Sequence, residues 1–254
     1  MNYMNLSLAW MGALNMALAL YGCTNGIETG LSAPEGIPVT VLAEISPVTK
    51  SGEAVSSDNG FDRTSFLSGD QIKVTRTKKA SGTAASQSAS YRYDGTSAWT
   101  VVGTSPVTLE PAVTYSAQFP ADYSAINQFQ TTSAAYLASN LLKTGDATSS
   151  DGTLDFTSSG KPFTHVNSKL TLKFTVNRET TIANDAVLVA AAGIRTAVST
   201  NQTITLYRPY PVDASRKYEW CGILRAVGGS AGTPATDLTV SLTCDGVTYK
   251  ATLT

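Results

Sequence analysis

The sequence predicts an all-β protein built from antiparallel strands. The chain has 254 residues, only 15 % of them charged, is rich in Ser and Thr, and carries a net charge of −1. Short segments with apolar residues at every second position recur along it, whereas one short stretch has helical spacing. Many short strands with little helix indicate an antiparallel sandwich or barrel. The near-neutral charge argues against nucleic acid as a partner, because such proteins carry a basic surface.

The first 22 residues have a different composition and predict an export signal. Residues 6–20 are almost wholly apolar, a length that suits the core of a signal peptide better than a membrane span. The run ends in Leu20-Tyr21-Gly22-Cys23, which resembles a bacterial lipobox. In that motif a peptidase cuts after the small residue, and the Cys thiol carries the lipid. We therefore predict residues 1–22 as a lipoprotein signal peptide and Cys23 as the site of lipid attachment, with acyl chains such as palmitate holding the protein on a bilayer.

Two alternatives to a lipid anchor stay open. No Lys or Arg lies in residues 1–10, where a signal peptide normally has positive charge. An ordinary secretory signal, or an apolar N-terminal helix with a chance cysteine, would also give the apolar run.

Residues 23–36 follow, and their Gly, Ser, Thr and Pro indicate a flexible tether.

The first predicted strand runs from Ile37 to Ile45, with its apolar residues at odd positions and hence on one face. A polar loop over 50–60 follows, and residues 78–90 are also predicted as a loop. Aromatic segments on either side of Asp94-Gly95 predict a hairpin. The strands that the same alternation predicts in this part of the chain are 71–77, 91–93, 99–101 and 113–119.

The second part of the chain begins after one short predicted helix at 134–142. The Gly- and Pro-containing stretch 157–162 is the best domain boundary, so we predict one β-sandwich over residues 37–160 and a second over 161–254. Asp245-Gly246 predicts a two-residue hairpin turn. The strands predicted here are 169–176, 186–191, 202–207, 218–226 and 238–253.

Signals for catalysis, metals and cofactors are weak. His165 is the only histidine, and a zinc site needs three or four ligands. Neither a dinucleotide-binding Gly-x-Gly-x-x-Gly nor a Walker pattern occurs. Several aspartates stand beside Gly, as in Asp94-Gly95 and Asp151-Gly152, where they more often cap turns than catalyse. We predict a protein that is not an enzyme, with no catalytic residues, no metal and no cofactor.

Cys221 and Cys244 leave two alternatives. An exported chain meets an oxidising compartment, so a disulfide between them is allowed. Two buried free thiols that pack as small apolar side chains are the other alternative.

Several motifs resemble the fimbrillin-like proteins of the Bacteroidales, the family of major and minor fimbrial subunits. Residues 66–74, Phe-Leu-Ser-Gly-Asp-Gln-Ile-Lys-Val, are similar to the family's aromatic-x-x-Gly-Asp-x-Ile-x-Val stretch. The most specific motif is Phe-x-His-x-x-Ser-Lys-Leu over residues 163–170. The resemblance covers about residues 37–176 and is weaker beyond them. The other segments that carry it are Tyr91–Tyr93 with Trp99, Tyr115–Pro120 with Asp122-Tyr123, and Tyr136–Leu142.

This resemblance implies two tandem transthyretin-like antiparallel β-sandwiches and a structural or accessory subunit, at the tip or anchor, of adhesive pili. It implies a lipid-anchored position at the outer membrane and cell surface. Other fimbrial subunits are the implied partners, along with host or bacterial surface ligands. His165 is then a structural residue. Fimbrillin-like chains often continue with further C-terminal strands, so we expect the second sandwich either to be truncated or to rely on a partner's strand.

The physical basis of such assembly is strand exchange, in which one subunit's strand fills a groove in another. Residues 37–45 are the predicted removable strand. Arg63, after the polar loop, is the predicted site of a trypsin-like maturation protease; an uncut strand and an ordinary surface arginine are the alternative. Two other functions stay open: a monomeric surface lipoprotein that binds glycan or host protein through its loops, and a structural lipoprotein that faces the periplasm.

Overall fold

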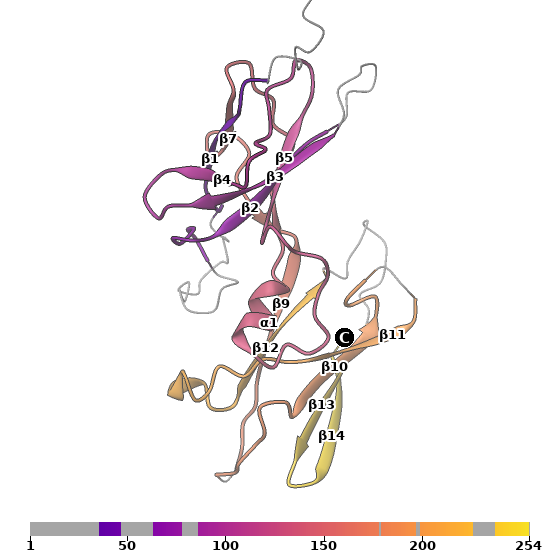
Figure 1. Cartoon of the computed structure of the whole chain (residues 1–254). Helices are drawn as coiled ribbons and strands as arrows, with labels where there is room; N and C mark the ends of the chain where they lie inside the picture. The colour runs from indigo at the N-terminus through magenta and orange to yellow at the C-terminus, as the bar shows by residue number, and fades with distance from the viewer. Residues whose placement is uncertain are drawn as a thin grey trace, which may run out of the picture. The chain divides into compact units, whose positions relative to one another are not determined.

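The computed structural model describes residues 36–46, 63–77, 86–177, 179–196, 199–225 and 237–253. The predicted signal peptide, Cys23 and the tether up to residue 35 lie outside these residues, as does the polar loop before Arg63. Nearly all of the regular secondary structure in the described chain is β-strand, most of it antiparallel, so the predicted fold class is confirmed (Figure 1). Within these residues no helix is long and apolar enough to cross a membrane.

A six-stranded antiparallel sheet forms the larger layer of the N-terminal half, in the order β4-β3-β2-β5-β6-β8. The predicted aromatic hairpin is present, since β3 and β4 pair with Tyr93 opposite Trp99. The last four residues of the predicted loop 78–90 are strand instead, because β3 begins at Gln87 and residues 87–90 pair with β2. The strands are β2 (Gln71–Arg76), β3 (Gln87–Tyr93), β4 (Trp99–Val102), β5 (Tyr115–Phe119), β6 (Leu142–Lys143) and β8 (Thr164–His165).

The second layer of this half is a pair of strands, β1 (Thr40–Ala43) and β7 (Thr153–Phe156). The two strands are parallel, with Thr40 opposite Thr153, which departs from the antiparallel pairing predicted throughout. Buried side chains from both layers form one hydrophobic cluster, the first core. Its largest members include Phe66, Ile72, Tyr91, Trp99, Tyr115, Leu142, Leu154, Phe156 and Phe163.

The C-terminal half also has two layers of strands. One is a four-stranded antiparallel sheet in the order β11-β10-β13-β14, and the other pairs β12 with β9. A second core of buried residues, including Trp220, Ile204 and Leu206, belongs to this half. The strands are β9 (Asn167–Lys173), β10 (Val187–Ala192), β11 (Asn201–Thr205), β12 (Glu219–Arg225), β13 (Leu238–Cys244) and β14 (Val247–Leu253).

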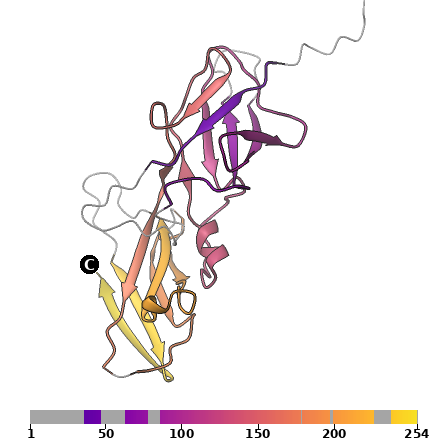
Figure 2. The ribbon, with the colours of Figure 1, turned by 90° about the vertical axis from the view of Figure 1, so that its left-hand side faces the viewer.

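The turn between β13 and β14 confirms the predicted Asp-Gly hairpin. Asp245 and Gly246 have φ angles of 51° and 76°. Positive values at both central residues are what a type I′ turn requires, and its twist matches that of the flanking strands. The two strands of this hairpin lie side by side at the C-terminal end of the chain (Figure 2).

One helix, α1 (Ser133–Ala138), interrupts the strands. Thr132 caps its N-terminus, since the hydroxyl oxygen accepts a hydrogen bond from the Ala135 N–H at 3.2 Å. The helix ends four residues before the predicted limit at 142, because Leu142 and Lys143 pair with β5 and β8 instead. Tyr136 of α1 packs against Cys221 and Ile223 of β12. The 3-10 helix η1 (Ala214–Arg216) precedes β12.

Candidate functional site

The segment 37–44, which contains β1, pairs with two other segments of backbone: residues 37–39 with residues 107–109, and residues 40–44 with β7 and the residue before it. On the β7 side, the N–H of Thr40 donates to Gly152 O at 2.8 Å, and that of Glu44 donates to Phe156 O at 3.0 Å. On the other side, the Val39 N–H donates to Val107 O at 3.0 Å, and the Leu109 N–H donates to Ile37 O at 2.7 Å. The segment 107–109 and β7 would therefore both present open backbone groups if β1 were removed.

The side chains of β1 and its flanks divide into a buried and an exposed face. Val39, Val41 and Ile45 are 6 %, 2 % and 3 % exposed, so the predicted apolar face is buried at these positions. Ile37, predicted to belong to that face, is 65 % exposed, because it precedes the strand at the edge of the first core. Leu42 points to the other side and is 42 % exposed.

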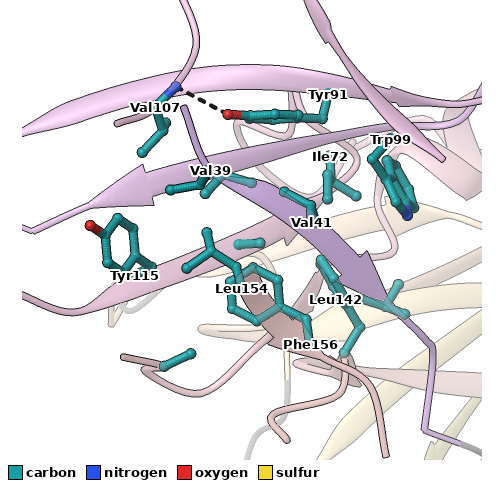
Figure 3. Packing of buried hydrophobic residues seen from close by; sticks show 14 of the residues in the cluster. Val39, Val41, Ile72, Tyr91, Trp99, Val107, Tyr115, Leu142, Leu154 and Phe156 are labelled. Atoms are coloured by element: carbon teal, nitrogen blue, oxygen red, sulfur yellow. Dashed lines mark hydrogen bonds between the residues drawn. The ribbon is translucent and has the colours of Figure 1, made fainter. Parts of the chain in front are cut away.

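The first core lies directly under β1 (Figure 3). Val39 and Val41 lie among Leu154 of the neighbouring strand β7 and side chains of the facing sheet, including Ile72 and Trp99. The hydroxyl oxygen of Tyr91 accepts a hydrogen bond from the Val107 N–H at 3.0 Å and holds the 107–109 segment on the core. Burial of the three β1-face side chains is worth about 5–9 kcal/mol before entropy is subtracted. Without β1, this apolar surface would face water.

Residues 66–74 have a physical explanation in the fold. The Phe66 ring packs edge-on against Trp99, Phe163 and Phe119, at centroid distances of 4.9, 5.3 and 5.4 Å. Gly69 has a φ of +90°, which a side chain would disfavour. The Asp70 carboxylate accepts a hydrogen bond from the Leu67 N–H at 2.7 Å and closes this turn. The motif therefore places the packed Phe66 ring and the Gly69-Asp70 turn directly before β2.

Arg63 lies next to the same turn. Its guanidinium forms an ion pair with Asp70 and lies 5.3 Å from the centre of the Phe119 ring, and its side chain is 18 % exposed. Burial raises the pKa of the Asp70 carboxyl, and the Leu67 N–H and Arg63 partly offset that rise. A protease that binds the Arg63 side chain has to draw it out of these contacts. Cleavage after Arg63 stays a prediction.

His165 lies in β8, opposite Leu142 of β6. Its Nδ1 lies 3.0 Å from Oδ1 of Asn140, a side chain that is 3 % exposed. Phe163, two residues earlier, is fully buried in the first core. These contacts agree with a structural role for the Phe-x-His pair, which stays a prediction.

Cys221 and Cys244 are both free thiols, so the disulfide is not formed in this structure. Cys221 is buried in β12, where burial raises the pKa of its thiol. Its Sγ lies 3.0 Å from Nη2 of Arg216. Cys244 ends β13 and packs at the margin of the second core.

The aspartates beside glycines lie in turns, as predicted. Asp94 accepts hydrogen bonds from the N–H groups of Thr96 and Ser97 at 2.7 and 3.0 Å, and Asp151 accepts one from the Thr153 N–H at 2.8 Å. In the part of the chain that the structure describes, no three His, Cys, Asp or Glu side chains are grouped so that they could hold a metal ion.

The sequence did not predict two of the segments that neighbour β1 and its flanks: residues 107–109 and β7. Thr153-Leu154-Asp155-Phe156 alternates over only four residues. Val107 and Leu109 alternate around one residue, which is too short to indicate a strand. Both stretches gain their role from hydrogen bonds to residues 37–44, which are far from them in sequence.

Comparisons with known proteins find similarity at the level of structure. No protein-family model matches the chain, and no curated protein matches it in sequence. A fimbrial protein from Bacteroides ovatus has 16 % identity and a TM-score of 0.43, and the match covers 87 % of this chain and 46 % of that one. A putative cell adhesion protein from Bacteroides fragilis has 16 % identity and a TM-score of 0.46, with 86 % and 87 % covered. Another from Parabacteroides distasonis has 10 % identity and a TM-score of 0.45, with 86 % and 80 % covered.

Proposed function

We propose that this chain is a fimbrillin-like surface lipoprotein, a structural or accessory subunit of adhesive pili that assembles by strand exchange. The observation that carries the proposal is the position of β1. With its flanking residues it covers the first core with three buried side chains; residues 37–39 form backbone hydrogen bonds with residues 107–109, and residues 40–44 form them with the β7 side. A strand held in this way can be replaced by another extended strand with the same alternation.

In this mechanism, cleavage after Arg63 separates β1 from the rest of the fold. The strand leaves, and the strand of a neighbouring subunit enters between β7 and residues 107–109. The cost of exposing the first core favours filling the groove rather than leaving it open. Lipid attachment at Cys23 holds the precursor at the outer membrane until that step, and the processed subunit loses the anchor.

The experiment compares surface polymer and mature N-termini from wild type, Arg63→Ala and Arg63→Lys. Wild type is expected to give high-mass ladders that heat dissolves, with an N-terminus at Thr64, and Arg63→Ala to give an anchored monomer. Arg63→Lys keeps both the positive charge beside Asp70 and a basic residue for a trypsin-like protease, so it should still be processed and form polymer. Equal polymer from wild type and Arg63→Ala, with the same N-terminus, rules out processing at this site.

The anchor has its own test. Cys23→Ser is expected to abolish incorporation of labelled palmitate and to release the precursor from the outer-membrane fraction. A wild type without label and a variant that stays membrane-bound would disprove the lipoprotein assignment. Absence of any polymer from an anchored, folded wild type would favour the alternative, a monomeric surface lipoprotein that binds glycan or host protein.

A further inference from the structure

A cavity of about 400 Å³ opens beside the first residues of β9 and the last residue of β12. Its volume falls in the range of small-molecule sites, roughly 300–1,000 Å³. Tyr123, Asn167, Arg195 and Arg225 supply most of its polar lining, and Ile126 and Val166 supply an apolar wall. None of these residues belongs to β1 or contacts it through a hydrogen bond, so the cavity is separate from the proposed assembly surface.

Two arginines come together at this cavity because of the local backbone. The N–H of Arg225, at the end of β12, donates to Ile194 O at 2.7 Å, which places Arg225 beside the residue that precedes Arg195. Nε of Arg195 donates to Ile126 O at 3.2 Å. That bond orients the guanidinium and leaves its two terminal nitrogens for other partners. Among the described residues, neither arginine forms an ion pair.

The Tyr123 hydroxyl adds a hydrogen-bond donor to the two arginines. Asn167 is 7 % exposed, and its Nδ2 donates to Ser139 O at 2.8 Å and to the Tyr123 hydroxyl oxygen at 3.2 Å. Because that oxygen accepts from Asn167, the phenol proton is available for a ligand oxygen. No carboxylate belongs to the described lining. The cavity therefore combines two positive charges and a hydroxyl donor with an apolar wall.

We propose that this cavity binds the carboxylate of an acidic sugar, with a uronic acid as the simplest member of the class. A guanidinium matches a carboxylate with two parallel hydrogen bonds. Within the described residues neither Arg195 nor Arg225 has a carboxylate partner, which favours an anionic ligand. The Tyr123 ring and the apolar wall provide a surface for the ring that carries the carboxylate. This role does not depend on strand exchange.

Calorimetric titration of the full chain tests the proposal with D-glucuronate, D-glucose, acetate and sulfate as probes. D-glucuronate is expected to bind, with at least tenfold higher affinity than acetate or sulfate, and glucose is expected not to bind. Arg225→Gln should lower the affinity for glucuronate at least tenfold, and Tyr123→Phe should lower it severalfold. Arg92→Gln, which removes an exposed arginine from β3, is the matched control and should leave the affinity unchanged.

Arg225 is exposed, so its variants are expected to fold, and circular dichroism checks this. Arg225→Lys keeps the charge but loses the planar guanidinium with its paired donors, and it should also bind glucuronate more weakly. Glucose that binds as tightly as glucuronate would contradict recognition of the carboxylate. Acetate or sulfate that binds as tightly would reduce the cavity to a general anion site and overturn the sugar assignment. Unchanged binding in both Arg225 variants, or no binding of glucuronate to wild type, would also overturn it.

Discussion

Asp94 organises the loop between β3 and β4 through hydrogen bonds to backbone N–H groups. Because these bonds, above all the one from Thr96, favour the ionised carboxyl, they lower the pKa of Asp94 to about 2. In the unfolded chain an aspartate titrates near pH 3.9. A lower pKa in the folded state means that ionised Asp94 stabilises the fold above about pH 4, and that this contribution is lost as the pH falls toward about 2.

The expected result is a difference between wild type and Asp94→Asn that depends on pH. Wild type should be more stable at pH 5, and the gap in free energy of unfolding should narrow between about pH 4 and pH 2. Urea unfolding at several pH values measures this difference in the free energy of unfolding. Asp122→Asn is the control, because that exposed carboxylate accepts no hydrogen bond from the described residues. A gap that stays constant over this range would contradict the role assigned to Asp94.

His165 makes a second prediction for a single residue. His165→Ala removes the hydrogen bond with buried Asn140 and should lower the free energy of unfolding by about 1–3 kcal/mol. Assembly should survive at a temperature where the variant is folded. Ser168→Ala, at an exposed position of the same motif, should change stability by less than about 0.5 kcal/mol. Lost assembly in a His165→Ala variant with unchanged stability would indicate a functional site instead.

Strand β1 has a buried and an exposed face, and substitutions at two adjacent residues compare the cost of a charge on each. Val41→Asp places a carboxylate in the first core and should destabilise the uncut monomer by more than about 3 kcal/mol. Leu42→Asp adds the same charge on the exposed face and should cost less than about 1 kcal/mol. Thermal unfolding of both variants measures the difference. Equal effects would mean that β1 does not cover the core in solution.

Alternation along the chain predicted the strands that have one buried face. It located β2, β5 and the hairpins on either side of Asp94 and Asp245, because buried and exposed side chains alternate there and the turn residues are distinctive. It missed β6, β7 and β8, which have two to four residues each. Strands this short are stabilised by pairing with distant segments, and a local pattern does not record that pairing.

In the molecule as a whole, the sequence predicted a strand over residues 37–45 but not the segments with which it pairs. The apolar face of residues 39–45 was visible as a pattern, with Ile37 wrongly included. The neighbours of β1 come from residues 107–109 and 152–156, far apart in sequence, so only the folded chain brings them together. The cavity with Arg195 and Arg225 was missed for the same reason, since its lining spans residues 123 to 225.

A reversible cross-link between β1 and β7 tests strand exchange most directly. Thr40 and Thr153 are direct partners in the parallel pair, and strands about 4.8 Å apart allow a disulfide between such positions. The measurement is surface polymer from Thr40→Cys/Thr153→Cys with and without reductant, beside each single variant. Strand exchange predicts no polymer while the disulfide is intact, recovery of polymer on reduction, and normal polymer from the single variants. Polymer formed by subunits whose cross-link is still intact would contradict it, because β1 would then not need to leave.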